Sequence, residues 1–204
     1  WSLSGRFRTG EPIGHRCTVN LGGDLIVLTT DGAISTLNLI KFDRSQLDAA
    51  AVTSKIQTLF NEDARSHRSK FGWMAVTYPK GRWLVVNVPV NEEVTQIQYV
   101  MNTITGSWCK FEGYNANCFA VMGEELYFGG NGGIVYKADT GYQDNGGVIT
   151  ADMRPAFNYF GSGRQKQFSL VRPNITASGL PTIAVGVNTD FVTADPTSIA
   201  TASA

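Results

Sequence analysis

The chain has 204 residues, 43% of them hydrophobic and 22 of them glycine, so it is long enough for one large β domain or two small ones. Its 17 basic and 17 acidic residues balance, which excludes a global field that draws nucleic acid or an acidic membrane surface but leaves room for a local basic patch. No run of about 18 apolar residues is present, so we expect no membrane span.

The first predicted unit is an antiparallel meander over residues 15–40. Gly22-Gly23 and Asp31-Gly32 are typical hairpin turns, because these residue types tolerate positive φ. The strands that they connect are expected at Arg16–Leu21, Asp24–Thr30 and Ala33–Leu39.

Residues 43–64 interrupt the strand pattern, because their apolar side chains recur at helical spacing. Ser54–Gln57 fits a capping box, and Ser45–Asp48 fits a looser one. We expect one helix here, or two short ones, inserted between two sheets. A solvated loop is expected over the charged residues Glu62–Lys70.

Residues 71–112 predict a complete four-stranded meander. Polar and apolar residues alternate over Gln96–Tyr99, which places one face of that strand in a core and the other in water. The strands are expected at Phe71–Tyr78, Trp83–Pro89, Thr95–Met101 and Ser107–Phe111.

Residues 117–153 predict a third unit, which repeats the first. The aligned pairs are Cys17 and Cys118, Gly22 and Gly123, Leu25 and Leu126, and Gly32 and Gly133, without a gap. A recurring meander is the mark of radial β-repetition, above all of the β-propeller, so we predict an all-β fold built from propeller blades. The strands of this unit are expected at Cys118–Met122, Glu125–Gly129 and Ile134–Ala138, with Val148–Met153 as a candidate outer strand.

The composition changes from Arg154 onward. Phe157–Gly163 is rich in aromatic residues and glycine, and two further strands are expected at Gln167–Arg172 and Thr182–Val187. The tail, Thr189–Ala204, offers little to bury, so we expect it to be weakly ordered or bound to a neighbour.

Three blade-like units do not close a propeller ring, which typically has four to eight blades. An open ring leaves strand edges unpaired, so we expect that more blades precede Trp1 or that other chains complete the sheet. We favour the first, with Trp1–Ser4 as the last strand of a preceding blade. The chain is therefore predicted to have two parts. Residues 1–153 form an incomplete set of blades, with the short helical insert at about residues 43–64, and residues 154–204 form a C-terminal β extension and tail.

Few residues are candidates for catalytic chemistry. His15 and His67 are the only histidines, and no HExxH, GxSxG or CxxC motif occurs, so neither is expected to act in catalysis. The odd number of cysteines, Cys17, Cys109 and Cys118, argues against a disulfide framework or a zinc site and predicts free, buried thiols. We therefore predict a protein that is not an enzyme and has no catalytic, cofactor-binding or metal-binding residue.

A modest basic cluster lies among aromatic residues in the segment after residue 154. Basic residues interleaved with aromatic ones can bind nucleic acid, and the same residue types are enriched at subunit interfaces. Because the net charge is zero, we favour a subunit interface. Its candidate residues are Phe157, Tyr159, Phe160, Arg164, Lys166 and Arg172.

Five stretches of the chain resemble the propeller-bearing tail hub, nozzle or stabilisation proteins of short-tailed bacteriophages. They are Ser54–Gln57, Trp83–Pro89, Gln98–Trp108, Asn117–Gly130 and Phe157–Pro173. The resemblance covers most of the chain after residue 40, and its motifs are blade turns and blade cores.

The resemblance implies a structural component of the virion tail, assembled in the bacterial host cytoplasm and working without a cofactor. Such proteins form homo-oligomeric rings, often sixfold, that contact the adaptor and fibres. Their channel passes DNA during ejection without sequence-specific binding. The helical insert and the segment after Arg154 break the regularity of the blades, so subunit contacts are expected there. The alternative is a glycan-binding or glycan-processing propeller module, because exposed Trp and Tyr can stack on sugars.

Overall fold

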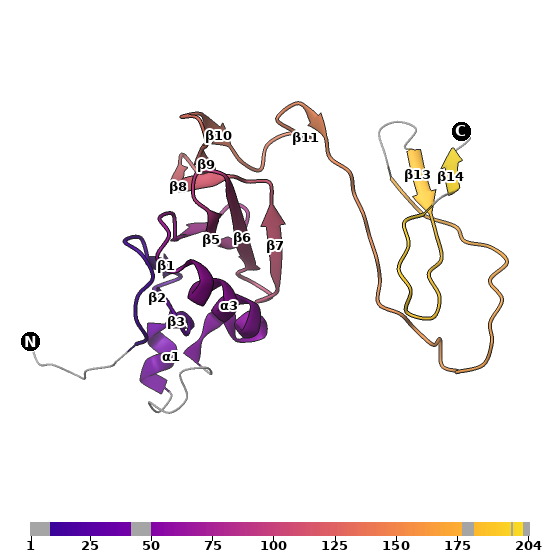
Figure 1. The fold of residues 1–204 in the computed structure, drawn as a ribbon, viewed down its shortest axis with the longest axis horizontal. Coiled ribbons are helices and arrows are strands. Elements are labelled where there is room, and N and C mark those ends of the chain that lie inside the picture. The colour runs from indigo at the N-terminus through magenta and orange to yellow at the C-terminus, as the bar shows by residue number, and fades with distance from the viewer. Residues whose placement is uncertain (1–8, 42–49, 177–181, 197, 202–204) are drawn as a thin grey trace, which may run out of the picture. The chain divides into compact units, whose positions relative to one another are not determined.

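The structure, a computed structural model, describes residues 9–41, 50–176, 182–196 and 198–201. These residues form five antiparallel sheets and few helices, which confirms the predicted all-β class (Figure 1). Contacts along the chain define two units, Trp1–Tyr142 and Gln143–Ala204. We call the first the core unit and the second the C-terminal unit.

The first sheet of the core unit contains β1 (Thr18–Leu21), β2 (Asp24–Thr29) and β3 (Gly32–Ser35), in that order. The predicted turn at Gly22 and Gly23 is present, with φ values of 56° and 89°. The predicted meander over the first two strands is therefore confirmed.

The second turn of this sheet differs from the prediction. Thr30 and Asp31 are its central residues, because Gly32 is already paired with Thr29 in the ladder between β2 and β3. Gly32 has a φ of 134°, and a Cβ built on it would lie 2.7 Å from Thr53 Oγ1. Glycine is therefore required here by close approach to the helical segment as well as by backbone conformation.

The predicted third strand was too long, because helix α1 (Thr36–Lys41) begins directly after Ser35. Ser35 stops the strand by capping that helix, since its Oγ accepts a hydrogen bond from the Asn38 N–H at 3.0 Å. Leu39, which was predicted to end the strand, is a buried residue of this helix.

Asp24 ties the start of α1 to the sheet. Its carboxylate accepts hydrogen bonds from Ser35 Oγ, Thr36 Oγ1 and the Leu37 N–H at 2.5, 2.9 and 3.0 Å. Burial raises the pKa of Asp24, but these hydrogen bonds outweigh it and lower the pKa below its ordinary value. The stabilisation is complete above the unfolded pKa of about 3.9 and is lost as the pH falls through the folded pKa.

We predict that Asp24→Asn lowers the free energy of unfolding at pH 7 by about 1–3 kcal/mol, because it removes hydrogen bonds to a charged acceptor. Urea unfolding of wild type and variant at pH 7 and pH 3 measures this, and the difference must shrink at pH 3. Asp144→Asn, at an exposed position, serves as the control and should change stability by about 0.5 kcal/mol or less. A difference of equal size at both pH values contradicts the assignment.

The second sheet contains β4 (Met74–Tyr78), β5 (Trp83–Asn91), β6 (Thr95–Asn102) and β7 (Trp108–Glu112), in that order. This confirms the predicted four-stranded meander. β4 begins later than predicted because Gly72, with a φ of 123°, still belongs to the preceding turn.

The third sheet contains β8 (Ala116–Met122), β9 (Glu125–Gly130) and β10 (Val135–Lys137), in chain order. All three strands were predicted to within two residues at each end. Val148–Met153, the candidate outer strand, does not join this sheet.

The first and third sheets share one hairpin design. Leu21 pairs with Asp24, Met122 pairs with Glu125, and the pairs next to them correspond in the same way. Both turns contain two residues at positive φ, with 56° and 89° in the first sheet and 57° and 66° in the third. The repeat seen in the sequence is therefore present in the first hairpin of each sheet. The second hairpin departs from it, because Leu28 pairs with Ala33 whereas Gly129 pairs with Val135, one residue further along.

The predicted helical segment lies between the first and second sheets, as the 3-10 helix η1 (Val52–Ile56) and the helix α3 (Gln57–His67). The capping box at Ser54 is wrong, because neither helix start has a side-chain cap. Thr53 instead accepts a hydrogen bond from the Ala33 N–H at 3.1 Å, which attaches η1 to β3.

Helix α3 continues through residues predicted to form a loop. Phe60 and Ala64 face the core and are fully buried, whereas Glu62 between them is exposed. Asp63 is partly buried and accepts a hydrogen bond from the Tyr99 hydroxyl at 2.6 Å. The looser capping box at Ser45–Asp48 lies outside the described residues, as does Trp1–Ser4.

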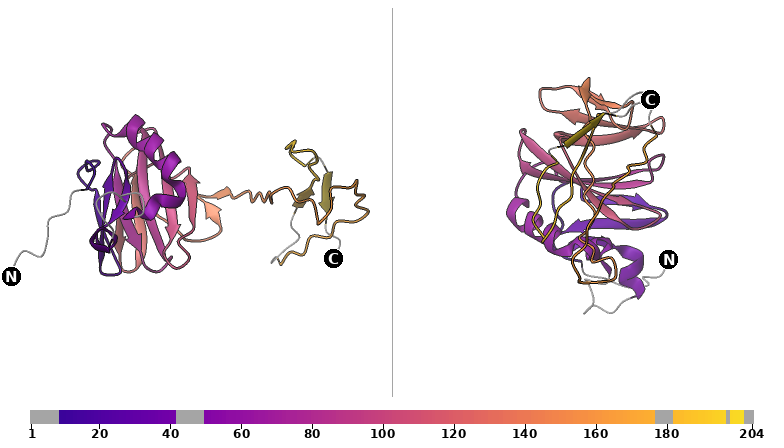
Figure 2. Two further views of the ribbon diagram at one scale, coloured as in Figure 1. Left: turned by 90° about the horizontal axis from the view of Figure 1, so that it is seen from below. Right: turned by 90° about the vertical axis from the view of Figure 1, so that its right-hand side faces the viewer.

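The first strands of the three sheets lie side by side. β1 contacts β4, and β4 contacts β8. Arg16, just before β1, forms a parallel bridge with Met74, and the Ala75 N–H donates to the Arg16 carbonyl at 3.4 Å. Figure 2 shows the second sheet layered between the other two.

Two hydrophobic clusters fill the spaces between the layers. The cluster between the first and second sheets also takes side chains from α3, whereas the other lies between the second and third sheets. The largest members of the first are Ile26, Leu28, Phe60, Trp73 and Tyr99, and those of the second are Tyr78, Val85, Val100, Phe119 and Leu126.

The described residues of the C-terminal unit form two hairpins. β11 (Gln143–Asp144) pairs with β12 (Gly147–Val148), and β13 (Thr182–Val185) pairs with β14 (Ser198–Thr201). The predicted strand at Gln167–Arg172 is wrong, because these residues have no regular secondary structure. β14 was not predicted, since its Ser, Ala and Thr residues resemble the rest of the tail.

Candidate functional site

The C-terminal unit has no buried residue among the positions described from 143 to 196. Residues 149–158 and 167–176 are extended without helix or strand. Large apolar side chains are exposed along the whole unit, and Met153, at 87% exposure, is an example. Surfaces of this kind mark interaction sites, because ordering a segment costs conformational entropy that its own contacts must offset.

The predicted aromatic residues form two small clusters in this unit. Phe157 and Tyr159 both contact Phe191, with ring centroids 4.9 and 6.4 Å apart. Phe160 contacts Phe168 at 5.6 Å. These ring contacts order the segment locally, but the rings stay exposed to solvent: Tyr159 and Phe160 are each 64% exposed.

The predicted basic residues follow the second cluster. The Arg164 N–H donates to Ser162 Oγ at 3.1 Å, and Lys166 Nζ donates to the carbonyls of Ser162 and Arg164. These contacts fold Arg164 and Lys166 into one turn close to Phe160 in the chain. Arg172 is exposed and lies further along the same extended segment.

Two residues of this surface were missed by sequence reasoning. Phe191 organises the first aromatic cluster, and Arg154 bridges Asp152 and Asp195 at 3.0 and 2.5 Å. Both lie in or contact the tail that composition marked as weakly ordered. The large apolar residues of that tail are few, Phe191, Val192 and Ile199.

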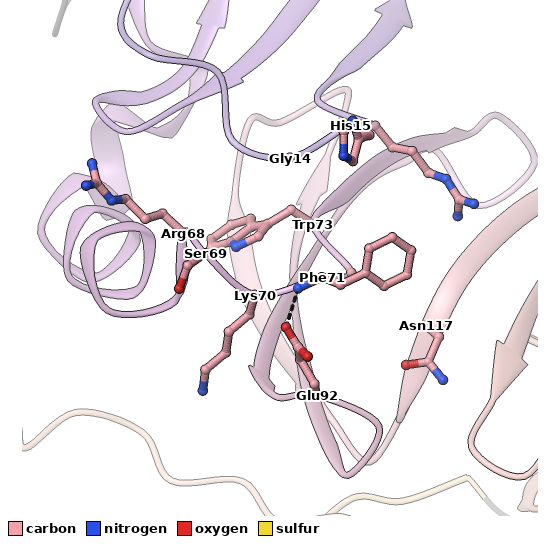
Figure 3. A pocket seen from close by; sticks show the side chains of 11 residues that line it. Gly14, His15, Arg68, Ser69, Lys70, Phe71, Trp73, Glu92 and Asn117 are labelled. Atoms are coloured by element: carbon pink, nitrogen blue, oxygen red, sulfur yellow. Dashed lines mark hydrogen bonds between the residues drawn. The ribbon is translucent and has the colours of Figure 1, made fainter.

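The core unit contains a cavity of about 280 Å³ where the first strands begin. It is lined by Gly14–Arg16 before β1, Arg68–Trp73 before β4, Glu92 after β5 and Asn117 in β8. We call it the strand-mouth cavity (Figure 3). None of these residues was singled out as a binding site from the sequence, because they come from four separate segments.

The two histidines do not form a common site. His15 lines the strand-mouth cavity, whereas His67 ends α3, where its Nε2 lies 3.9 Å from Asp63 and its buried Nδ1 has no partner. The cysteines are free, but only Cys17 and Cys118 are partly buried and Cys109 is exposed, so the expectation of three buried thiols was wrong.

Metal and membrane features were searched over the part of the chain that the structure describes. No group of three or more His, Cys, Asp or Glu residues there is arranged to hold a metal ion. None of the helices described has the length and apolar character needed to cross a membrane.

Comparisons of this chain with protein-family models, curated proteins and solved structures found no match.

Proposed function

We propose that this chain is a non-enzymatic structural component of the tail of a short-tailed bacteriophage, located in the virion. In this proposal it forms part of a hub or nozzle ring around the DNA-ejection conduit and provides a platform for fibres. The observation that carries the proposal is the C-terminal unit, which exposes apolar side chains along its length and has no buried residue among those described. Such a unit gains stability by packing on another subunit.

The core unit supports the proposed blade architecture. Propeller blades are small antiparallel meanders packed face to face, with their first strands around a common axis. Three consecutive meanders, first strands in contact and the parallel bridge from Arg16 to Met74 agree with an arc of such a ring. Further blades, from this polypeptide or from other chains, would complete the propeller.

Ring assembly follows from the same two parts. A ring requires a different surface on each side of every subunit, so that the subunits join head to tail. In this proposal the C-terminal unit supplies one surface, including the six predicted interface residues, and the neighbouring subunit supplies the other. The sixfold symmetry, the adaptor and fibre partners, and non-specific passage of DNA rest on the resemblance to tail hub and nozzle proteins.

The proposal is tested with a double variant, Phe157→Ser and Phe160→Ser, in the full chain. We expect wild type to form a closed oligomer and the variant to lose most of it, because the exposed rings are the contact surface. Native mass spectrometry and light scattering measure the mass, and electron microscopy shows whether rings form.

A matched control removes two apolar side chains that are at least as exposed, from turns of the core unit, Val94→Ser and Ile104→Ser. The control should retain the wild-type mass. Wild type that stays monomeric at all concentrations, or a Phe157/Phe160 variant that still forms wild-type rings, would overturn the proposal.

A further inference from the structure

The strand-mouth cavity has a rigid wall. Trp73 is 2% exposed, and its indole N–H donates to the His67 carbonyl at 2.9 Å. Gly14 has a φ of 74°, and a Cβ there would lie 3.2 Å from the Trp73 Cβ, so this approach of the two segments requires glycine. The cavity is therefore formed before any ligand arrives, as small-molecule sites usually are.

The charges around the cavity favour an anion. Arg68 is paired with Glu11 at 3.4 Å, and Lys70 donates to the Val90 carbonyl. The exposed Arg16 guanidinium has a long contact of 3.9 Å with the Met74 sulfur and no carboxylate partner among the described residues. It is the cation of the lining that remains free to form a bidentate pair with a ligand carboxylate.

The only acidic side chain of the lining is already engaged. Glu92 accepts a hydrogen bond from the Phe71 N–H at 2.5 Å, which fixes the loop that carries Phe71. The remaining acceptor capacity of the Glu92 carboxylate can take a hydrogen bond from a ligand hydroxyl. The cations of the lining suit a negatively charged group of the ligand, and the Glu92 carboxylate suits its hydroxyl groups. The same carboxylate disfavours a phosphate chain, because it would repel the several negative charges of that chain.

Phe71 adds an apolar surface beside these polar groups. Its side chain is 65% exposed although it borders a cavity, and Figure 3 shows the ring extending toward the side where His15 and Asn117 lie. Asn117 offers an amide on that side. An exposed aromatic face next to amide, carboxylate and guanidinium groups matches the alternating C–H and hydroxyl surfaces of a sugar ring.

We propose that the strand-mouth cavity binds an acidic sugar, with its carboxylate on Arg16 and its ring against Phe71. The site does not rest on the proposed tail function, because it lies wholly within the core unit and needs no second subunit. The acidic sugar is a unit of a larger glycan or a free uronate, and both present the same carboxylate and ring.

The probe is sodium glucuronate, with glucose as its matched neutral counterpart, titrated into the full chain at low salt. Isothermal titration and saturation-transfer NMR measure binding. We expect glucuronate to bind with a Kd of about 1 mM, the range for a ligand of this size. Glucose should bind about tenfold more weakly, since it lacks the carboxylate.

Two variants assign the contacts. Arg16→Gln should weaken glucuronate binding about tenfold and leave glucose unchanged, whereas Phe71→Ala should weaken both sugars. Arg82→Gln, at an exposed arginine in the turn between β4 and β5 and outside the cavity lining, is the control and should behave as wild type. Far-ultraviolet circular dichroism confirms that each variant is folded.

The proposal fails if glucuronate and glucose bind equally, or if Arg16→Gln retains wild-type affinity. Inorganic phosphate is the third probe. Phosphate that displaces glucuronate at equal concentration identifies a general anion site and overturns the sugar assignment. If an oligoglucuronate binds more tightly than glucuronate, the ligand is a unit of a larger glycan. If the two bind with equal affinity, the ligand is the free acid.

Discussion

Replacing Phe60 with alanine is expected to lower the free energy of unfolding by about 3–5 kcal/mol, the usual cost of removing a buried aromatic ring. The side chain is fully buried in the cluster between the first two sheets. Its ring contacts Trp73 at 6.0 Å and Tyr99 at 6.3 Å between centroids, so it joins α3 to the segment just before β4 and to β6. Such a loss is a large share of a typical stability of about 5–15 kcal/mol.

Urea unfolding of the full chain measures this effect, and the adjacent Leu59→Ala is the matched control. Leu59 belongs to the same helix but is 56% exposed, so its removal should cost about 1 kcal/mol or less. Similar losses for the two variants would show that α3 is not packed as described.

Replacing Asn87 with leucine is expected to cost about 3 kcal/mol or more. The side chain is fully buried, and its Nδ2 donates to the carbonyls of Gly72 and Ala116, each at 2.9 Å. Its Oδ1 accepts a hydrogen bond from Gln98 Nε2 at 2.8 Å. Leucine removes all three hydrogen bonds, and a buried polar group that is left without a partner costs about 1–3 kcal/mol.

A double-mutant cycle with Gln98→Leu separates the pair from its surroundings. Gln98 Nε2 also donates to the Tyr114 carbonyl at 2.7 Å, so its own removal is costly. The double variant should lose less stability than the sum of the two single losses. The reason is that the Asn87 and Gln98 amides are removed together, so neither is left without the other as its hydrogen-bond partner. Strict additivity in thermal or urea unfolding would argue against the network.

Much of the core unit could be predicted because its signals are local. Turn residues such as Gly22-Gly23, Gly81 and Gly123, together with alternating residues, set each hairpin within a few positions, and the strands follow them. Helix α1 was missed although one feature that starts it, the Ser35 cap, is local. Thr36–Lys41 contains apolar residues typical of a strand, and Asp24, which holds the helix start, lies on β2.

The candidate sites were predictable to different degrees. Aromatic and basic residues after 154 stand out in the sequence, and the structure places five of the six predicted residues in or next to two aromatic clusters. Their role as a subunit interface stays a prediction. The strand-mouth cavity could not be predicted, because contacts among the first strands bring Arg16, Phe71 and Asn117 together across the chain.

The exposed apolar length of the C-terminal unit separates two events that usually coincide. In most domains, dehydration of apolar groups accompanies chain folding, and it produces the heat-capacity change of that transition. Here the core unit undergoes this change when it folds, whereas the C-terminal unit undergoes it only when something covers its side chains. In the proposed assembly, the calorimetric signature of this part of the chain therefore belongs to association, and it depends on protein concentration.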